Sequence, residues 1–156
     1  MIELVFVIVV LGVLASIAIS KMAVTRDDAM IVKGKSQVSA IRSAIVLQKS
    51  KNMMRGLENG GNPTTLDALG TVTSSDGNKL FDYDTNASDP TKKLLDYPVY
   101  SKNANGHWRK TAANKYSFRV LNEDINFTYN AGSFDCTHGT AATTVLSEKY
   151  CKTLTE

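Results

Sequence analysis

The sequence predicts an α+β fold in which one long N-terminal α-helix packs on an antiparallel β-sheet. Three patterns in the 156 residues point to this class. The first nineteen residues are almost wholly apolar, helical spacing of apolar residues continues to about residue 54, and two segments between residues 115 and 130 alternate with a period of two. Charged residues make up 21% and hydrophobic residues 43% of the chain, a composition typical of a folded protein rather than a disordered one.

The apolar start, residues 1–25, is predicted to be a transmembrane or filament-core helix segment. A helix of roughly 20 residues, rising about 1.5 Å per residue, is long enough to cross a bilayer. The run starts at once, without the positive stretch of a secretory signal, so we expect it to be retained. Glu3 is the one charged residue among the first nineteen, and a carboxylate at depth costs about 2.5–3.5 kcal/mol when unpaired. Either Glu3 pairs with another copy of the chain, or it reaches the interface alone.

Residues 26–55 are predicted to be the amphipathic half of the same helix, which would then run from residue 2 to residue 54. Apolar or small residues recur in steps of three and four, and glycines at positions 56, 60 and 61 end the pattern. Residues 21–55 also carry eight basic side chains against two acidic ones. Nucleic acid, anionic lipid and acidic surfaces of neighbouring copies are the competing partners for this charge, and a merely solvated helix face is the alternative.

Residues 56–156 are predicted to form a globular head. Residues 115–121 and 125–130 are expected to pair as an antiparallel hairpin with one face on the helix and the other in water, and residues 63–69 to form a short helix. Cys136 and Cys151 would most simply form one disulfide, closing a loop of about 15 residues and contributing about 3 kcal/mol. Two unpaired buried thiols are the alternative.

Catalysis is not expected, because His107 and His138 stand alone and no catalytic or phosphate-binding motif is present. No cofactor and no metal site are predicted. Two sequons are candidate N-glycosylation sites, at Asn86 and Asn126, and an aspartate stands two residues before each. Asn86 is the better acceptor, since we expect it in an exposed loop and Asn126 in a strand.

The first 45 residues resemble the mature N-terminus of type IV pilins and type II secretion pseudopilins. Ile2, Glu3 and Leu4 precede an apolar helix that contains Gly12, and an amphipathic continuation follows. The match begins at the third residue of the family's mature sequence, so its first two residues have no counterpart. Over residues 56–156 the likeness is one of layout, with a long helix, a loop, an antiparallel sheet and a C-terminal cysteine pair. Ser20 stands where many members have the proline that kinks the helix.

The resemblance implies a pilin-like fold and a structural role as the major pilin of a type IV pilus that serves adhesion, motility or DNA uptake. Glu3 and Gly12 would be the assembly residues, with Glu3 meeting the N-terminal amine of the next subunit. Partners would be other copies, the bilayer before assembly, the inner-membrane assembly machinery and a prepilin peptidase. The chain would start in the bacterial inner membrane as a precursor, carry an N-terminal methylation, and end in an extracellular filament.

Two alternative functions stay open. A type II secretion pseudopilin would share the fold, and pseudopilins bind calcium in a loop, so a group of aspartates is a candidate calcium site. These are Asp76, Asp82, Asp84 and Asp89. A single-pass membrane-anchored binding domain that never polymerises is the other alternative.

Overall fold

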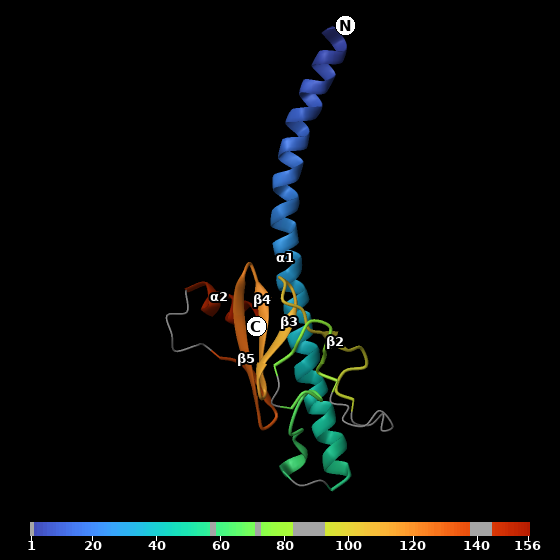
Figure 1. Cartoon of the computed structure of the whole chain (residues 1–156), viewed down its shortest axis with the longest axis vertical. Coiled ribbons are helices and arrows are strands. Elements are labelled where there is room, and N and C mark those ends of the chain that lie inside the picture. The colour runs from blue at the N-terminus through green and yellow to red at the C-terminus, as the bar shows by residue number, and fades with distance from the viewer. Residues whose placement is uncertain (1, 57–58, 71–72, 83–92, 138–144) are drawn as a thin grey trace.

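The structure, a computed structural model, describes residues 2–56, 59–70, 73–82, 93–137 and 145–156. It is an α+β fold with one long helix, a further helix and antiparallel sheets. Figure 1 shows α1 running along the head and then extending well beyond it as a stalk that carries the N-terminus. The elements are α1 (Ile2–Met54), η1 (Asn59–Gly61), β1 (Lys79–Leu80), β2 (Val99–Tyr100), β3 (Trp108–Ala112), β4 (Lys115–Val120), β5 (Glu123–Asn130), β6 (Ser133–Cys136) and α2 (Val145–Thr155).

The predicted helix from residue 2 to residue 54 is confirmed as α1. It is continuous through Gly12 and Ser20, so in the single chain neither residue interrupts it. The helix ends at Met54, and Gly56 two residues later has a φ of 68° and donates its backbone N–H to the Met53 carbonyl at 3.0 Å. Glycine adopts this left-handed conformation without the steric cost that a Cβ imposes, and it is the usual residue just past a helix end.

The predicted hairpin is confirmed as β4 and β5, the central strands of a four-stranded antiparallel sheet ordered β3-β4-β5-β6. Phe118 pairs with Ile125 and Tyr116 with Phe127, so the alternating apolar residues of both strands share one buried face. The turn is tighter than predicted. It consists of Leu121 and Asn122 alone, both with positive φ, a conformation that matches the twist of two paired strands.

The core lies between this sheet face and one stripe of α1. Val38, Ile41 and Ile45 of α1 are almost fully buried in one cluster with the aromatic residues of the sheet. Gly34 allows the closest approach, because a Cβ at this position would lie 2.4 Å from Cε1 of Phe118. The sheet therefore holds the C-terminal half of α1 and leaves the N-terminal half without intramolecular cover.

The structure corrects the short helix predicted for residues 63–69, which form bends and turns instead. Asp67 competes with helical hydrogen bonding there, since its Oδ1 accepts the backbone N–H of Leu69 at 2.9 Å. The Pro63 carbonyl accepts the hydroxyl of Tyr129 at 2.5 Å, which anchors the segment to the sheet. Helix α2 and strands β3 and β6 were not predicted.

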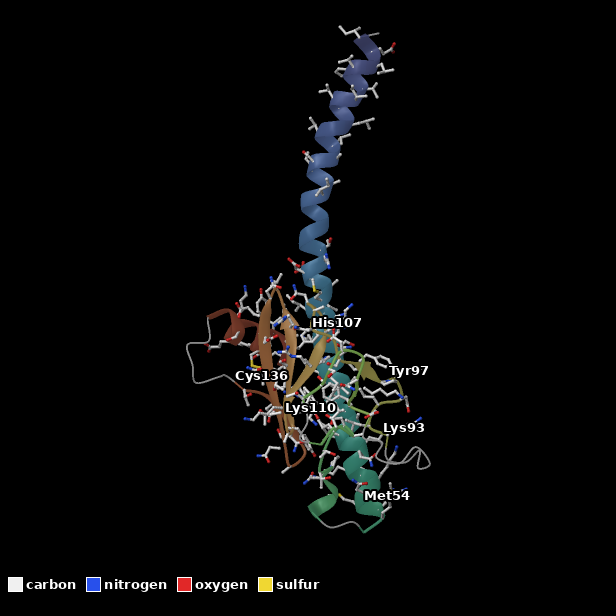
Figure 2. All side chains as sticks on the ribbon, in the orientation of Figure 1. Met54, Lys93, Tyr97, His107, Lys110 and Cys136 are labelled. Carbon is white, nitrogen blue, oxygen red and sulfur yellow. A yellow bond between two sulfur atoms is a disulfide. The ribbon has the colours of Figure 1, made fainter. Side chains whose placement is uncertain are left out.

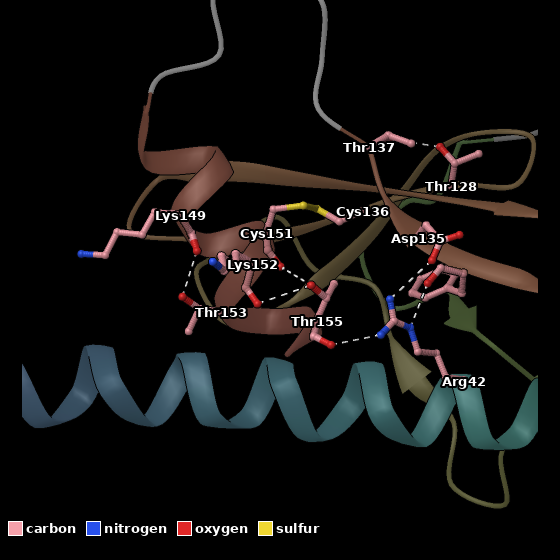
Figure 3. Close-up of a disulfide and its surroundings, with 11 residues drawn as sticks. Arg42, Thr128, Asp135, Cys136, Thr137, Lys149, Cys151, Lys152, Thr153 and Thr155 are labelled. Atoms are coloured by element: carbon pink, nitrogen blue, oxygen red, sulfur yellow. Dashed lines mark hydrogen bonds and ion pairs between the residues drawn. A yellow bond between two sulfur atoms is a disulfide. The ribbon is translucent and has the colours of Figure 1, made fainter.

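Cys136 and Cys151 form a disulfide that joins β6 to α2, so the alternative of two free thiols is wrong. Figure 3 shows the disulfide above α1, with Arg42 of α1 reaching the same region. Arg42 donates to the Phe134 carbonyl at 3.0 Å and to the Thr155 carbonyl at 3.2 Å. The disulfide and this arginine together hold the C-terminal helix against α1.

Candidate assembly surface

The N-terminal segment Ile2–Ile19 of α1 is apolar and exposed along its whole length. None of it is buried, and its mean hydropathy is 2.9. Figure 2 shows its side chains radiating from the stalk on all sides. By length and composition it could cross a membrane, a test that signal sequences near an N-terminus also pass. Apolar surface gains about 25 cal/mol per Å² when it leaves water, so this segment favours lipid or another protein surface as its surroundings.

Glu3 lies in the first turn of α1 and is exposed. The positive end of the helix dipole favours a carboxylate at this position. Within the described part of the chain, no salt bridge involves Glu3. The helix terminus thus tolerates the charge, and a partner that neutralises it must come from outside the described chain.

Gly12 lies in the middle of the exposed segment, and a Cβ added there would meet no atom within 4 Å. A glycine in a helix interior is about 1 kcal/mol less favourable than alanine. Packing within one chain gives no reason for this cost. Small residues do let two helices approach closely in a membrane, which is a contact between molecules.

Two of the basic residues after the apolar segment are used inside the molecule. Lys33 donates its Nζ to the Gly106 carbonyl at 2.9 Å, and Arg42 bridges α1 to β6 and α2. Arg42 also lies 3.5 Å from the Asp135 carboxylate. These two side chains attach the head to α1. The sequence analysis had considered only partners outside the molecule, or water, for the basic segment.

A groove of about 550 Å³ lies between α1 and residues 95–100. Tyr97 and Tyr100 form its exposed rim, and Gln37 in its lining accepts the indole N–H of Trp108 at 3.0 Å. His107 also lines the groove. Burial, and then the positive charges of Lys33 and Lys102, lower the pKa of His107, while Asp76 opposes them.

A buried polar network that sequence reasoning missed lies beneath the sheet. The Lys110 ammonium lies 2.6 Å from Oδ1 of Asp67 and donates to the Gly70 carbonyl at 2.6 Å, and the Tyr116 hydroxyl donates to Oδ2 of Asp67 at 2.5 Å. Burial, and then the Asp67 carboxylate, raise the pKa of Tyr116. The signal was the period of two in β3, which puts Lys110 on the same face as Trp108. Because the Asp67 carboxylate is paired in this way, the network stabilises the fold by joining the segment 67–70 to strands β3 and β4.

The remaining predicted site residues are not brought together. Asn126 is exposed on β5, and its backbone carbonyl is bonded to Thr137 within the sheet. Asn86, Asp84, Asp89 and His138 lie outside the described residues. Burial raises the pKa of Asp82, whereas Asp76 accepts a backbone N–H from Asn103. Among the described residues, no group of three or more His, Cys, Asp or Glu could hold a metal ion.

Comparisons of this chain with family models, with curated proteins and with solved structures find no match. The resemblance to pilins therefore rests on residues 1–45, and the fold class rests on the coordinates. The features available for a function are the uncovered apolar helix, the carboxylate at its tip and the head that holds its other half.

Proposed function

We propose that this chain is the structural subunit of a type IV pilus filament, which polymerises through its hydrophobic N-terminal helix. The observation that carries the proposal is the fully exposed apolar segment Ile2–Ile19, with Glu3 in its first turn, on the same helix that forms the core of the head. Such a segment is stable in lipid before assembly and in a bundle of its own copies afterwards.

The Glu3 carboxylate in the first turn of α1 favours polymerisation over simple membrane anchoring. A buried charge is tolerated only when it is paired, and the N-terminal amine of a neighbouring copy supplies the opposite charge to Glu3. Gly12 lets neighbouring helices approach closely. A contact between two different surfaces of the same chain repeats from copy to copy, and it produces a helical filament when the rotation between copies does not close a ring. A secretion pseudopilin uses the same contacts in a short filament.

The test is Glu3→Gln in the full chain, expressed in a bacterium with a filament-assembly machinery. The change keeps the shape of the side chain and removes its charge. We expect normal membrane insertion and a loss of filaments of about tenfold or more by electron microscopy, because 1.4 kcal/mol already changes an equilibrium tenfold. Glu148→Gln, an exposed position on α2, is the matched control and keeps filaments at normal yield. Normal filaments from the Glu3 variant would contradict the pairing of Glu3 with the N-terminal amine of a neighbouring copy.

A membrane-anchored binding domain is the second candidate, favoured by the groove between α1 and residues 95–100. Pockets of a few hundred Å³ that combine apolar walls with a few polar groups are typical binding sites. Electron microscopy of the wild-type chain separates the two functions. Long fibres support the filament, whereas a membrane-bound chain that forms none under assembly conditions supports the anchored domain.

A further inference from the structure

The pair of Lys110 on β3 and Asp67 is the most enclosed ion pair of the head. Both side chains are fully buried, whereas in every other salt bridge of the described chain both partners are at least 28% exposed. Two charges taken out of water pay a desolvation cost that their attraction returns only in part. The interior therefore favours any change that removes both charges together.

The lysine nitrogen is held against the carboxyl group. Nζ of Lys110 lies 2.6 Å from Oδ1 of Asp67, and it donates to the Gly70 carbonyl at the same distance, so two contacts fix its position. A carboxyl C–O bond is about 1.2 Å long, so the nitrogen lies within about 4 Å of Cγ of Asp67. Groups held in a near-attack geometry reach effective concentrations of about 10⁵–10⁸ M. This proximity offsets the unfavourable condensation of an amine with a carboxyl group.

Tyr116 and Asp82 supply polar groups that such a condensation needs. The Tyr116 hydroxyl donates to Oδ2 of Asp67 at 2.5 Å, so it stabilises negative charge that develops on the carboxyl oxygens. Oδ1 of Asp82 is buried and accepts no hydrogen bond within the described part of the chain. Burial, and then the Asp67 charge, raise the pKa of Asp82, which suits its carboxyl to carry a proton beside the pair.

We propose that Lys110 and Asp67 join in an intramolecular amide bond, for which the ion pair is the starting state. Nζ of Lys110 attacks Cγ of Asp67, the N–C bond forms, one C–O bond breaks, and the oxygen leaves as water. The two protons that the ammonium loses leave with this oxygen, so the step needs no oxidant, reductant or further reactant. The product carries no charge, and its burial keeps out the water that would hydrolyse it. The inference does not depend on the proposed filament.

The amide gives the second edge of the sheet a covalent attachment. Strands β3 and β6 are the two edge strands of the four-stranded sheet, and the disulfide already joins β6 to α2. The amide joins β3 to the segment 63–70 across 43 residues of the chain. Cross-links of this kind stabilise a fold mainly by restricting the unfolded chain. Unlike the disulfide, this one is insensitive to reductant.

Tryptic digestion and tandem mass spectrometry of the full chain, reduced and unfolded, test the bond. Trypsin releases residues 56–79, which contain Asp67, as a linear peptide when the two side chains are not joined. In the joined chain Lys110 is not cleaved, so we expect a branched peptide of residues 56–79 and 110–115 that has lost one water. The linear peptide at full yield, with no branched product, overturns the proposal.

Two variants separate the amide from the ion pair. Lys110→Arg keeps the positive charge, but a guanidinium does not lose its proton and cannot attack, so only the linear peptide is expected. A branched peptide at Asp67 in this variant would contradict the assignment to Lys110.

Asp82→Asn keeps the shape of the side chain and removes the proton carrier. We expect bond formation to slow about a hundredfold or more in samples taken during cell-free synthesis in mild detergent. Asp96→Asn, at an exposed carboxyl, is the matched control and should form the bond at the wild-type rate. Fluorescence of buried Trp108 shows that the heads of both variants fold. A wild-type rate in Asp82→Asn overturns the role of Asp82, while the branched peptide of the unchanged chain still decides the bond.

Discussion

Lys110→Met removes a buried ammonium from the core of the head while keeping most of its volume. The side chains of Lys110 and Asp67 are both fully buried, with 2.6 Å between ammonium and carboxylate. After the change, the Asp67 carboxylate keeps the Tyr116 hydroxyl and the Leu69 backbone N–H, but it loses its counter-charge. The Gly70 carbonyl loses its donor as well.

The expected cost follows from what stays buried. Breaking a buried ion pair by removing one partner destabilises a protein by about 3–5 kcal/mol, because the other charge is left uncompensated. The lost hydrogen bonds agree with this range, since bonds to charged groups contribute about 1.5–3 kcal/mol each. Lys110→Met combined with Asp67→Asn removes both charges and keeps an acceptor for Tyr116. We therefore expect the double variant to recover part of the loss.

Urea unfolding of the full chain in mild detergent measures the effect. Trp108 is the one tryptophan in the sequence and is fully buried in the head, so its fluorescence reports on this domain. Lys115→Met, at an exposed position of β4, is the control and should change stability by no more than about 0.5 kcal/mol. If Lys110→Met lowers the free energy of unfolding by less than about 1 kcal/mol, the Lys110–Asp67 pair does not stabilise the head as we propose.

Three further changes test other contacts. Gly34→Ala should destabilise the head by about 1–2 kcal/mol in urea, because overpacking against Phe118 outweighs the helix-propensity gain of about 1 kcal/mol, and a more stable variant would contradict this. Replacing Cys136 and Cys151 by serine should cost about 3 kcal/mol by the same assay, and an unchanged midpoint would argue against the disulfide. Burial lowers the pKa of His107, so the unfolded chain binds its proton more readily and stability falls as pH drops below about 6.5. His107→Asn should reduce this dependence of the free energy of unfolding on pH. An unchanged dependence would contradict a lowered pKa of His107 as its cause.

Much of the fold could be predicted because its signals are local. A continuous apolar run marks the first half of α1, apolar residues in steps of three and four mark its second half, and a period of two marks β4 and β5. The turn between the strands was placed within two residues. Helix α2 was not predicted, although Leu146, Tyr150 and Leu154 recur every four residues; the disulfide at Cys151 and buried Leu154 hold it against the rest of the head.

The candidate site could be predicted in part. Glu3, Gly12 and the apolar run are visible in the sequence because a charge or a glycine in such a run is conspicuous. The exposed side of α1 between residues 36 and 54 is not visible in the same way. Apolar positions on a helical wheel mark both the stripe that the sheet covers and the stripe that it leaves exposed. Only the position of the sheet distinguishes Ile41, which is buried, from Leu47, which is exposed.

The sequence by itself determined the long helix, its uncovered apolar start and the central hairpin, because periodicity and hydropathy are properties of neighbouring residues. Tertiary structure alone decided which charges serve the fold. Lys110 reaches Asp67 across 43 residues, and Arg42 reaches Thr155 across 113. Such pairs depend on how distant segments meet. Once Lys110 is buried beside Asp67, removing either charge destabilises the core. The same packing buries Ile41 of α1 and leaves Leu47 and Met54 of the same helix exposed.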